Sequence, residues 1–120
     1  MPSSEIVLVV DRNRRNFELM REVLQKENLE ALGASSVEEM RQRIAEHKIS
    51  LALIDLAGLG RDVWAVCEEL RERSIPFVVI SPRFSPEVSQ EGSARGARGV
   101  LVKPLTVREL VGIVRGLLGN

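Results

Sequence analysis

Apolar runs alternate with amphipathic segments five times along this chain. Four of the runs are short and apolar at both odd and even positions, which is typical of parallel strands that helices cover on both faces. The remaining run, "LEALGA", is weaker but falls at the matching place in the alternation. The expected strands are residues 6–10, 29–34, 51–55, 77–81 and 99–103.

The segments between the runs have apolar residues at helical spacing, and two of them begin with recognisable capping sequences. In "TVRE", Thr106 precedes Glu109 by three residues and predicts a capping box. In "SPE", Ser85 takes the N-cap and a proline takes the first helical position. The helix after Ser85 has Val88 as its one large apolar residue, and Gly92 lies in its middle, where glycine costs about 1 kcal/mol against alanine. We expect this helix to be short, exposed and mobile.

A strand followed by a helix, repeated five times with short loops, predicts an α/β fold. Because crossover connections are right-handed, the pattern gives one doubly wound parallel sheet of five strands in the order 2-1-3-4-5, the flavodoxin-like arrangement. The chain has 120 residues, and we expect a single domain over residues 1–120. A closed eight-unit barrel would need about twice this length.

Composition removes several classes of function. Lysine plus arginine equals aspartate plus glutamate, 17 each, and tyrosine is absent, so neither charge nor stacking aromatics favours nucleic acid. We expect Cys67 to be a small core residue, His47 a solvated helix end and Trp64 a partly exposed packing residue. No apolar run could span a membrane, and "MPSSE" has no basic and apolar leader, so we expect a cytoplasmic protein without a membrane partner.

Four of the expected strands end in a polar residue that chemistry could use. In a doubly wound sheet the working end is the carboxyl edge of the strands, where the strand order reverses. A carboxylate there can take a phosphoryl group to form an acyl phosphate, a lysine can pair with the phosphoryl oxygens, and a serine hydroxyl can donate to one of them. The four residues are Asp11, Asp55, Ser81 and Lys103.

Over nearly its whole length the sequence resembles the receiver domain of two-component response regulators. The resemblance lies in "VVDRNRRNFELMREVL", "LALIDLAGLGRDVWAVCEELR", "FVVIS" and "GARGVLVKPLTVREL", of which the Lys-Pro element with its upstream Gly-Ala is the most specific. It implies that Asp55 is the phosphoacceptor, Ser81 the hydroxyl that binds phosphate and moves on activation, and Lys103 the phosphate partner. It also implies a cis bond before Pro104.

The same resemblance implies a place in a prokaryotic phosphorelay. A histidine kinase or phosphotransfer protein would phosphorylate Asp55, and the chain would be a signalling domain rather than an enzyme, apart from gaining and losing its own phosphate. No DNA-binding output domain fits within this length, so we expect the output to be a partner protein, or the chain to be a fragment. The expected output surface is the 85–96 helix together with the 99–118 region.

The main departure from the family is Arg12, which stands where a second acid usually binds magnesium. Mg²⁺ prefers oxygen ligands, and an arginine offers none. Asp11, Asp55 and the carbonyl oxygen of Ala57 would then form a weakened magnesium site if Arg12 points to water. Alternatively Arg12 pairs with Asp11 or Asp55 in place of the metal, which is the hypothesis we pursue, because a guanidinium can bind a carboxylate through two hydrogen bonds.

Two further departures concern the phosphate donors and the switch. Pro82 has no N–H where the family usually directs one at the phosphoryl group. Val100 replaces an aromatic residue that turns inward on activation, so any switch must act through Ser81 and the helix after Ser85. The loop after Asp55 also differs from the family, with Leu59 and Gly60 in place of its usual Pro-Gly.

Several other functions remain open. One is a pseudo-receiver that never takes phosphate and serves as a protein-interaction module, with Arg12 replacing the metal. An aspartyl-phosphate hydrolase is disfavoured, because it needs an acid two residues after the nucleophile, where this chain has Ala57. A flavin or nucleotide binder of the same topology would want a Gly-, Ser- or Thr-rich phosphate loop, and "DRNRRN" has no glycine. Apart from a weak magnesium ion, no cofactor is expected.

Overall fold

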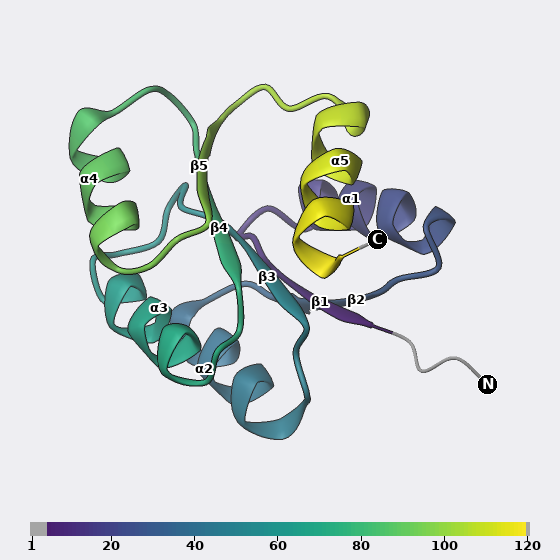
Figure 1. The fold of residues 1–120 in the computed structure, drawn as a ribbon, viewed down its shortest axis with the longest axis horizontal. Coiled ribbons are helices and arrows are strands. Elements are labelled where there is room, and N and C mark those ends of the chain that lie inside the picture. The colour runs from purple at the N-terminus through teal and green to yellow at the C-terminus, as the bar shows by residue number, and fades with distance from the viewer. Residues whose placement is uncertain (1–4, 120) are drawn as a thin grey trace.

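Five parallel strands form one sheet in a computed structural model that describes residues 5–119. The order is β2-β1-β3-β4-β5, as predicted, with β1 and β3 in the centre (Figure 1). Each neighbouring pair is parallel, and Val10 lies opposite Ala34 of β2 and Ile54 of β3. The strands are β1 (Ile6–Val10), β2 (Glu30–Ala34), β3 (Leu51–Asp55), β4 (Phe77–Ser81) and β5 (Gly99–Val102).

The helices begin where the sequence supplies caps. Thr106 and Glu109 form the predicted capping box. The Ser85 hydroxyl accepts a hydrogen bond from the N–H of Val88 at 3.2 Å, as expected for an N-cap. The helices are α1 (Arg14–Lys26), α2 (Val37–Glu46), α3 (Val63–Glu72), α4 (Pro86–Ala94) and α5 (Val107–Leu118). None of the helices in residues 5–119 has the length and apolarity to cross a membrane.

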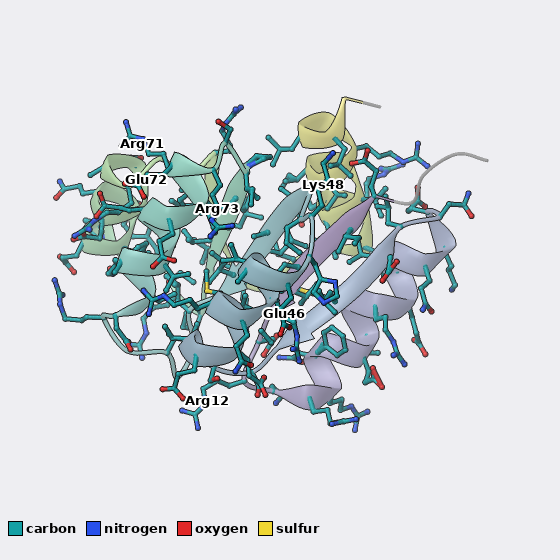
Figure 2. All side chains as sticks on the ribbon, turned by 90° about the horizontal axis from the view of Figure 1, so that it is seen from below. Arg12, Glu46, Lys48, Arg71, Glu72 and Arg73 are labelled. Carbon is teal, nitrogen blue, oxygen red and sulfur yellow. The ribbon has the colours of Figure 1, made fainter. Side chains whose placement is uncertain are left out.

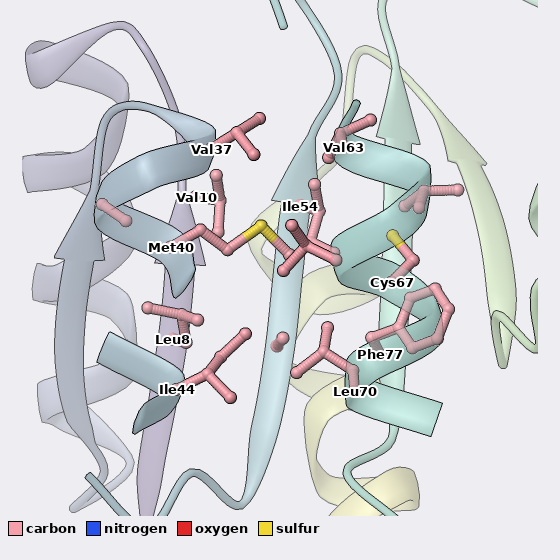
Figure 3. Close-up of a cluster of buried hydrophobic side chains, with 14 of the residues drawn as sticks. Leu8, Val10, Val37, Met40, Ile44, Ile54, Val63, Cys67, Leu70 and Phe77 are labelled. Carbon is pink, nitrogen blue, oxygen red and sulfur yellow. The ribbon is translucent and has the colours of Figure 1, made fainter. Parts of the chain in front are cut away.

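The helices cover the sheet on both faces and divide the core in two. Helices α1 and α5 lie on one side of the sheet, and α2, α3 and α4 lie on the other (Figure 1). Successive strand residues serve opposite faces: Val7 and Val9 pack with α1 and α5, whereas Leu8 and Val10 pack with α2 and α3. Figure 3 shows the cluster on the α2 and α3 side, in which the side chain of Met40 extends from α2 toward β3 and α3. This double coverage explains why the strands are apolar at both parities.

Some local expectations need correction. Trp64 is buried, with 8% of its surface exposed, because it lies one helical turn before Cys67 on the stripe of α3 that faces the core. Cys67 is fully buried and His47 is an exposed C-cap, as predicted. Lys103 falls just beyond the end of β5 rather than within it. The expectation for "MPSSE" concerns residues 1–5, of which residues 1–4 lie outside the described residues.

Gly92 has a different role from the one its propensity indicated. It is the buried residue of α4, and a Cβ placed there would lie 2.9 Å from Cγ2 of Val100 and 3.4 Å from Cγ2 of Val79. The glycine therefore lets α4 approach the sheet closely, in addition to weakening the helix. Whether α4 is mobile stays a prediction; its length of nine residues and its largely exposed surface agree with the expectation of a short, exposed helix.

Candidate functional site

Four polar side chains meet at the carboxyl edge of the sheet. Asp11 follows β1, Asp55 ends β3, Ser81 ends β4 and Lys103 follows β5. The strands run in parallel and are adjacent in the order β1-β3-β4-β5, so their carboxyl ends lie side by side. The backbone N–H of Lys103 donates to the carbonyl of Ser81 at 3.0 Å, which fixes the end of β5 beside the end of β4.

Asp55 is the most enclosed of the four, with 2% of its surface exposed. Its Oδ1 accepts a hydrogen bond from the N–H of Ala57 at 3.0 Å. Its Oδ2 lies 2.5 Å from Nζ of Lys103, in an ion pair that is not aligned as a hydrogen bond. The backbone therefore holds Oδ1 of Asp55. Oδ2 lies close to the Lys103 ammonium group but accepts no hydrogen bond from the described residues.

Asp11 lies beside Asp55 and is also buried, with 5% of its surface exposed. Its Oδ1 accepts from the N–H of Asn13 at 2.8 Å, and its Oδ2 has no hydrogen-bond partner among the described residues. Burial raises the pKa of Asp11 above its ordinary value, and the nearby Asp55 carboxylate raises it further, whereas the Asn13 N–H and Lys103 lower it. The crevice thus holds two buried acids and a single cation.

The donors in this crevice fit a magnesium ion that keeps most of its water. Mg²⁺ is commonly held by one or two carboxylates with water in the other positions. Asp11 supplies a buried oxygen without a partner, Asp55 supplies a second carboxylate, and the carbonyl of Ala57 lies in the following loop. Residues 5–119 contain no group of three or more histidine, cysteine or acidic side chains that could hold a metal. The set is therefore a minimal one.

Arg12 does not enter the crevice, so the prediction that it pairs with Asp11 or Asp55 is wrong for this structure. Its Nη1 donates to the carbonyl of Gly58 at 2.8 Å, and none of the salt bridges within residues 5–119 includes it. Figure 2 shows Arg12 at the periphery of the molecule. Lys103, which follows β5, already supplies the cation next to Asp55, and the backbone carbonyl of Gly58 accepts the hydrogen bond of the Arg12 side chain.

On the β4 side, the Ser81 hydroxyl is engaged with its own loop. It donates to the carbonyl of Arg83 at 2.6 Å. The next residue, Pro82, is exposed and brings no N–H to the edge of the sheet. Farther along the same loop, Phe84 has 71% of its surface exposed. Sequence reasoning did not single out Phe84, although a large aromatic residue in the proline-flanked "SPRFSP" is a signal for an exposed side chain.

Of the remaining expected residues, Val100 lies in β5 and Pro104 follows it. Val100 is half-buried and packs under α4 against Gly92. The peptide bond between Lys103 and Pro104 is cis, as the resemblance implied. Sequence reasoning also missed Gly58, which has φ of +78° and receives the Arg12 side chain. The signal for Gly58 was the glycine-containing loop "AGLG" that directly follows the buried acid.

A cavity of about 440 Å³ opens beside Ser81, between the β3–α3 loop and the start of α4. Its walls include Leu56 and Leu59 from that loop, Trp64 from α3 and Val88 from α4. The cavity is chiefly apolar, and neither Asp11 nor Asp55 is among its lining residues. It brings the only tryptophan of the chain against the loop that follows Asp55.

Comparisons with known proteins agree on one family. A family model described as "Response regulator receiver domain" matches residues 7–115. The transcriptional regulatory protein ResD of Bacillus subtilis is 31% identical over 113 residues, which cover 93% of this chain and 47% of ResD. The transcriptional regulatory protein SrrA of Staphylococcus aureus is 30% identical over 116 residues, 96% of this chain and 48% of SrrA. The chain thus spans about half the length of these curated relatives.

Solved structures give the same fold at lower identity. A response regulator receiver domain protein (CheY-like) from Methanospirillum hungatei superposes with a TM-score of 0.89 at 22% identity, covering 98% of this chain and 95% of that one. A response regulator from Thermotoga maritima gives 0.87 at 21% identity, covering 98% and 100%. At this identity the likeness concerns the fold alone, and it extends over almost the whole of both chains.

Proposed function

Since this chain belongs to the family of response regulator receiver domains, we propose that it accepts a phosphoryl group on Asp55 and signals the change to a partner protein. Membership makes it a signalling domain of two-component systems. The donor we propose is a histidine kinase or a phosphotransfer protein. Asp55 would be the nucleophile, with Lys103 and Ser81 binding the transferred group.

The observation that carries this proposal is the state of the Asp55 carboxylate. It is almost fully buried, oriented by the N–H of Ala57, and directs its free oxygen at Nζ of Lys103. Lys103 has 31% of its side chain exposed, so this oxygen meets its cation near the rim of the crevice rather than in the deep core. Such an arrangement supports attack on an incoming phosphoryl group whose oxygens then pair with the same lysine.

The proposed step transfers one phosphoryl group and requires no redox partner. Oδ2 of Asp55 attacks phosphorus, and the bond from phosphorus to the histidine nitrogen of the donor breaks. The electron pair of that bond stays on the imidazole. The product is an acyl phosphate on Asp55, whose added charge Lys103 would partly neutralise. Ser81 could donate a hydrogen bond to a phosphoryl oxygen only after it leaves the carbonyl of Arg83.

We propose a weak magnesium site in the same crevice. Asp11, Asp55 and the carbonyl oxygen of Ala57 would hold Mg²⁺, which would offset charge on the phosphoryl oxygens. Binding is expected to be weak because only two acids contribute and the third family position is Arg12. Asp11 would need to be ionised for this role, and its raised pKa means that magnesium competes with a proton there.

The hydrogen bond between Ser81 and Arg83 supports the proposal of an output surface on α4. The hydroxyl and the Arg83 carbonyl join the end of β4 to the loop that leads into α4, so a change at Ser81 reaches that loop directly. We propose that the partner protein contacts the 85–96 segment and the neighbouring 99–118 region.

A phosphorylation-independent interaction module is the second candidate, and one observation favours it. Pro82 leaves the edge of β4 without an N–H donor, so phosphate would be held by fewer groups than in a typical receiver. In one form of this hypothesis Arg12 replaces the metal. The structure does not support that form, because the Arg12 side chain bonds to the carbonyl of Gly58 and not to an acid. Phosphotransfer is the function the site supports better, since the acceptor, lysine and hydroxyl are all at the crevice.

Mass spectrometry of the intact protein tests the proposal. Incubation with a small phosphodonor and magnesium should add one phosphate, about 80 Da, as expected for an acyl phosphate. The adduct should be lost in Asp55→Asn and retained in Ser85→Ala, which changes a hydroxyl outside the crevice. Labelling that persists in Asp55→Asn would show that another residue is the acceptor, and no labelling of the wild type would favour the interaction module.

A further inference from the structure

The side chain of Arg12 joins two loops at the carboxyl edge of the sheet. Arg12 belongs to the loop between β1 and α1, and its Nη1 donates to the carbonyl of Gly58 at 2.8 Å. Gly58 lies in the loop between β3 and α3, three residues after Asp55. One hydrogen bond thus connects the residue after Asp11 with the loop that leaves the proposed phosphoacceptor.

Gly58 is shaped to receive this arginine. Its φ is +78°, and a Cβ at this position would lie 2.9 Å from Cδ and 3.2 Å from Nη1 of Arg12. The arginine stem therefore lies across the bare side of the glycine backbone, where an L side chain would be both strained and in its way. Arg12 and Gly58 are matched to each other, which a solvated arginine would not require.

The contact bears on Asp55 through a single intervening residue. Ala57 precedes Gly58, its N–H holds Oδ1 of Asp55 at 3.0 Å, and its carbonyl oxygen is the proposed backbone ligand for magnesium. Asp55 is fixed in the buried strand, so anchoring Gly58 holds the far end of the short segment that contains Ala57 and leaves Ala57 less room to move. A bond made by Arg12 outside the crevice thus limits the motion of two groups that line it.

We propose that Arg12 is a positioning residue, a strap that holds the β3–α3 loop so that Ala57 keeps Asp55 oriented. This chain then has a structural tie at the position where the family has a metal ligand. The consequence for phosphorylation rests on the function proposed above. The strap itself is a property of the protein without metal or phosphate, so it can be tested separately.

Hydrogen exchange in the metal-free protein, without a phosphodonor, tests the strap alone. Arg12→Met keeps the length of the stem and removes the donor. Arg14→Met is the matched control, because Arg14 is also an exposed arginine and makes none of the hydrogen bonds found to the β3–α3 loop. Amides of residues 56–60 should exchange about threefold faster or more in Arg12→Met and at the wild-type rate in Arg14→Met. Equal exchange in the two variants would overturn the proposal.

A double-mutant cycle with Gly58→Ala tests the contact itself. The added methyl should displace Arg12 and speed exchange of residues 56–60 in the wild-type background. In the Arg12→Met background it should speed exchange by a clearly smaller factor, because the methyl still strains the loop and crowds the stem but no longer breaks a hydrogen bond. Equal factors in the two backgrounds would mean that Arg12 and Gly58 act independently, contrary to the proposal.

The rate of Asp55 phosphorylation separates positioning from charge. Under the strap, Arg12→Met should lower the maximal rate about threefold or more, with little change in the donor concentration at half-maximal rate, and Arg12→Lys should recover part of it. If Arg12 acted only by repelling Mg²⁺, Arg12→Met would be faster than wild type, and the positioning role would be wrong. If no variant accepts phosphate but residues 56–60 still loosen in Arg12→Met, the proposed function fails and the strap stands.

Discussion

Helices α3 and α4 flank the same strand, β4, yet they are held in different ways. α3 buries five side chains in the core, namely Val63, Trp64, Val66, Cys67 and Leu70. The only buried residue of α4 is Gly92, which has no side chain, and Val88 is only half-buried. A surface ion pair between Arg95, the C-cap of α4, and Glu68 of α3 adds to the attachment of α4. One helix is thus anchored by apolar burial and the other mainly by close backbone approach and charge.

This difference assigns the two helices to different tasks. Regions with few buried apolar contacts open at lower free energy than the core does. α4 follows the loop that carries Ser81 and Arg83, so it is the helix that a change at the phosphoryl site can move at low cost. α3 follows the loop of Asp55 but is fixed by the core, and it therefore provides a rigid base for the acceptor.

The largest expected effect comes from the same substitution made in each helix. Val66→Ala in α3 removes two methyl groups from a fully buried position and should lower the free energy of unfolding by about 2–3 kcal/mol, including a cavity. Val88→Ala in α4 should lower it by about 1 kcal/mol or less, since Val88 is half-buried. Urea unfolding measures both, and equal losses would remove the contrast between the helices.

Thiol labelling of Cys67 gives a second measure of how firmly α3 is held. Burial raises the pKa of the Cys67 thiol to about 12, so at pH 8 the native protein holds almost no thiolate there. Labelling should be at least about a hundredfold slower than in denaturant, because reaction requires α3 to open. The rate from any direct native reaction should still be rising between pH 8 and pH 10. Rapid labelling at pH 8 in the absence of denaturant would show that α3 opens readily.

A smaller effect on the free energy of unfolding is expected at Gly92, where helix propensity and packing predict changes of opposite sign. Helix propensity alone predicts that Gly92→Ala stabilises α4 by about 1 kcal/mol. The added Cβ would meet Val100 at 2.9 Å, so we expect a net loss of about 1–2 kcal/mol. Gly112→Ala in α5 is the control, since nothing lies within 4 Å of its Cβ position, and it should be neutral or stabilising. A stabilised Gly92→Ala would mean that α4 shifts away from β5 without cost.

Sequence patterns were sufficient for the fold and for the gathering of polar residues at one edge. Strands buried on both faces are apolar at both parities, and this signal does not depend on any particular contact. The positions of Asp11, Asp55, Ser81 and Lys103 followed from the same logic, because parallel strands place their ends together. Their roles in phosphate binding remain predictions.

The rest depended on tertiary neighbours that a sequence does not rank. Arg12 was expected to pair with one of the two acids, but Lys103, which is 48 residues from Asp55 along the chain, pairs with Asp55, and the arginine bonds to Gly58 instead. Glycine has a low helix propensity in any helix, yet at position 92 its lack of a side chain lets α4 pack closely against Val79 and Val100. Trp64 is a different case, because the predicted core position of Cys67 already marked the buried side of α3, and Trp64 lies one helical turn before it.

Hydrogen exchange of α3 and α4, with and without phosphorylation, tests the central claim most directly. In the unmodified protein, amides of residues 86–94 should exchange faster than those of residues 63–72. A small phosphodonor with magnesium should change the protection of residues 82–96 in wild type, leave α3 nearly unchanged, and have no effect in Asp55→Asn. Equal protection of the two helices, or a phosphorylation effect confined to α3, would contradict the account.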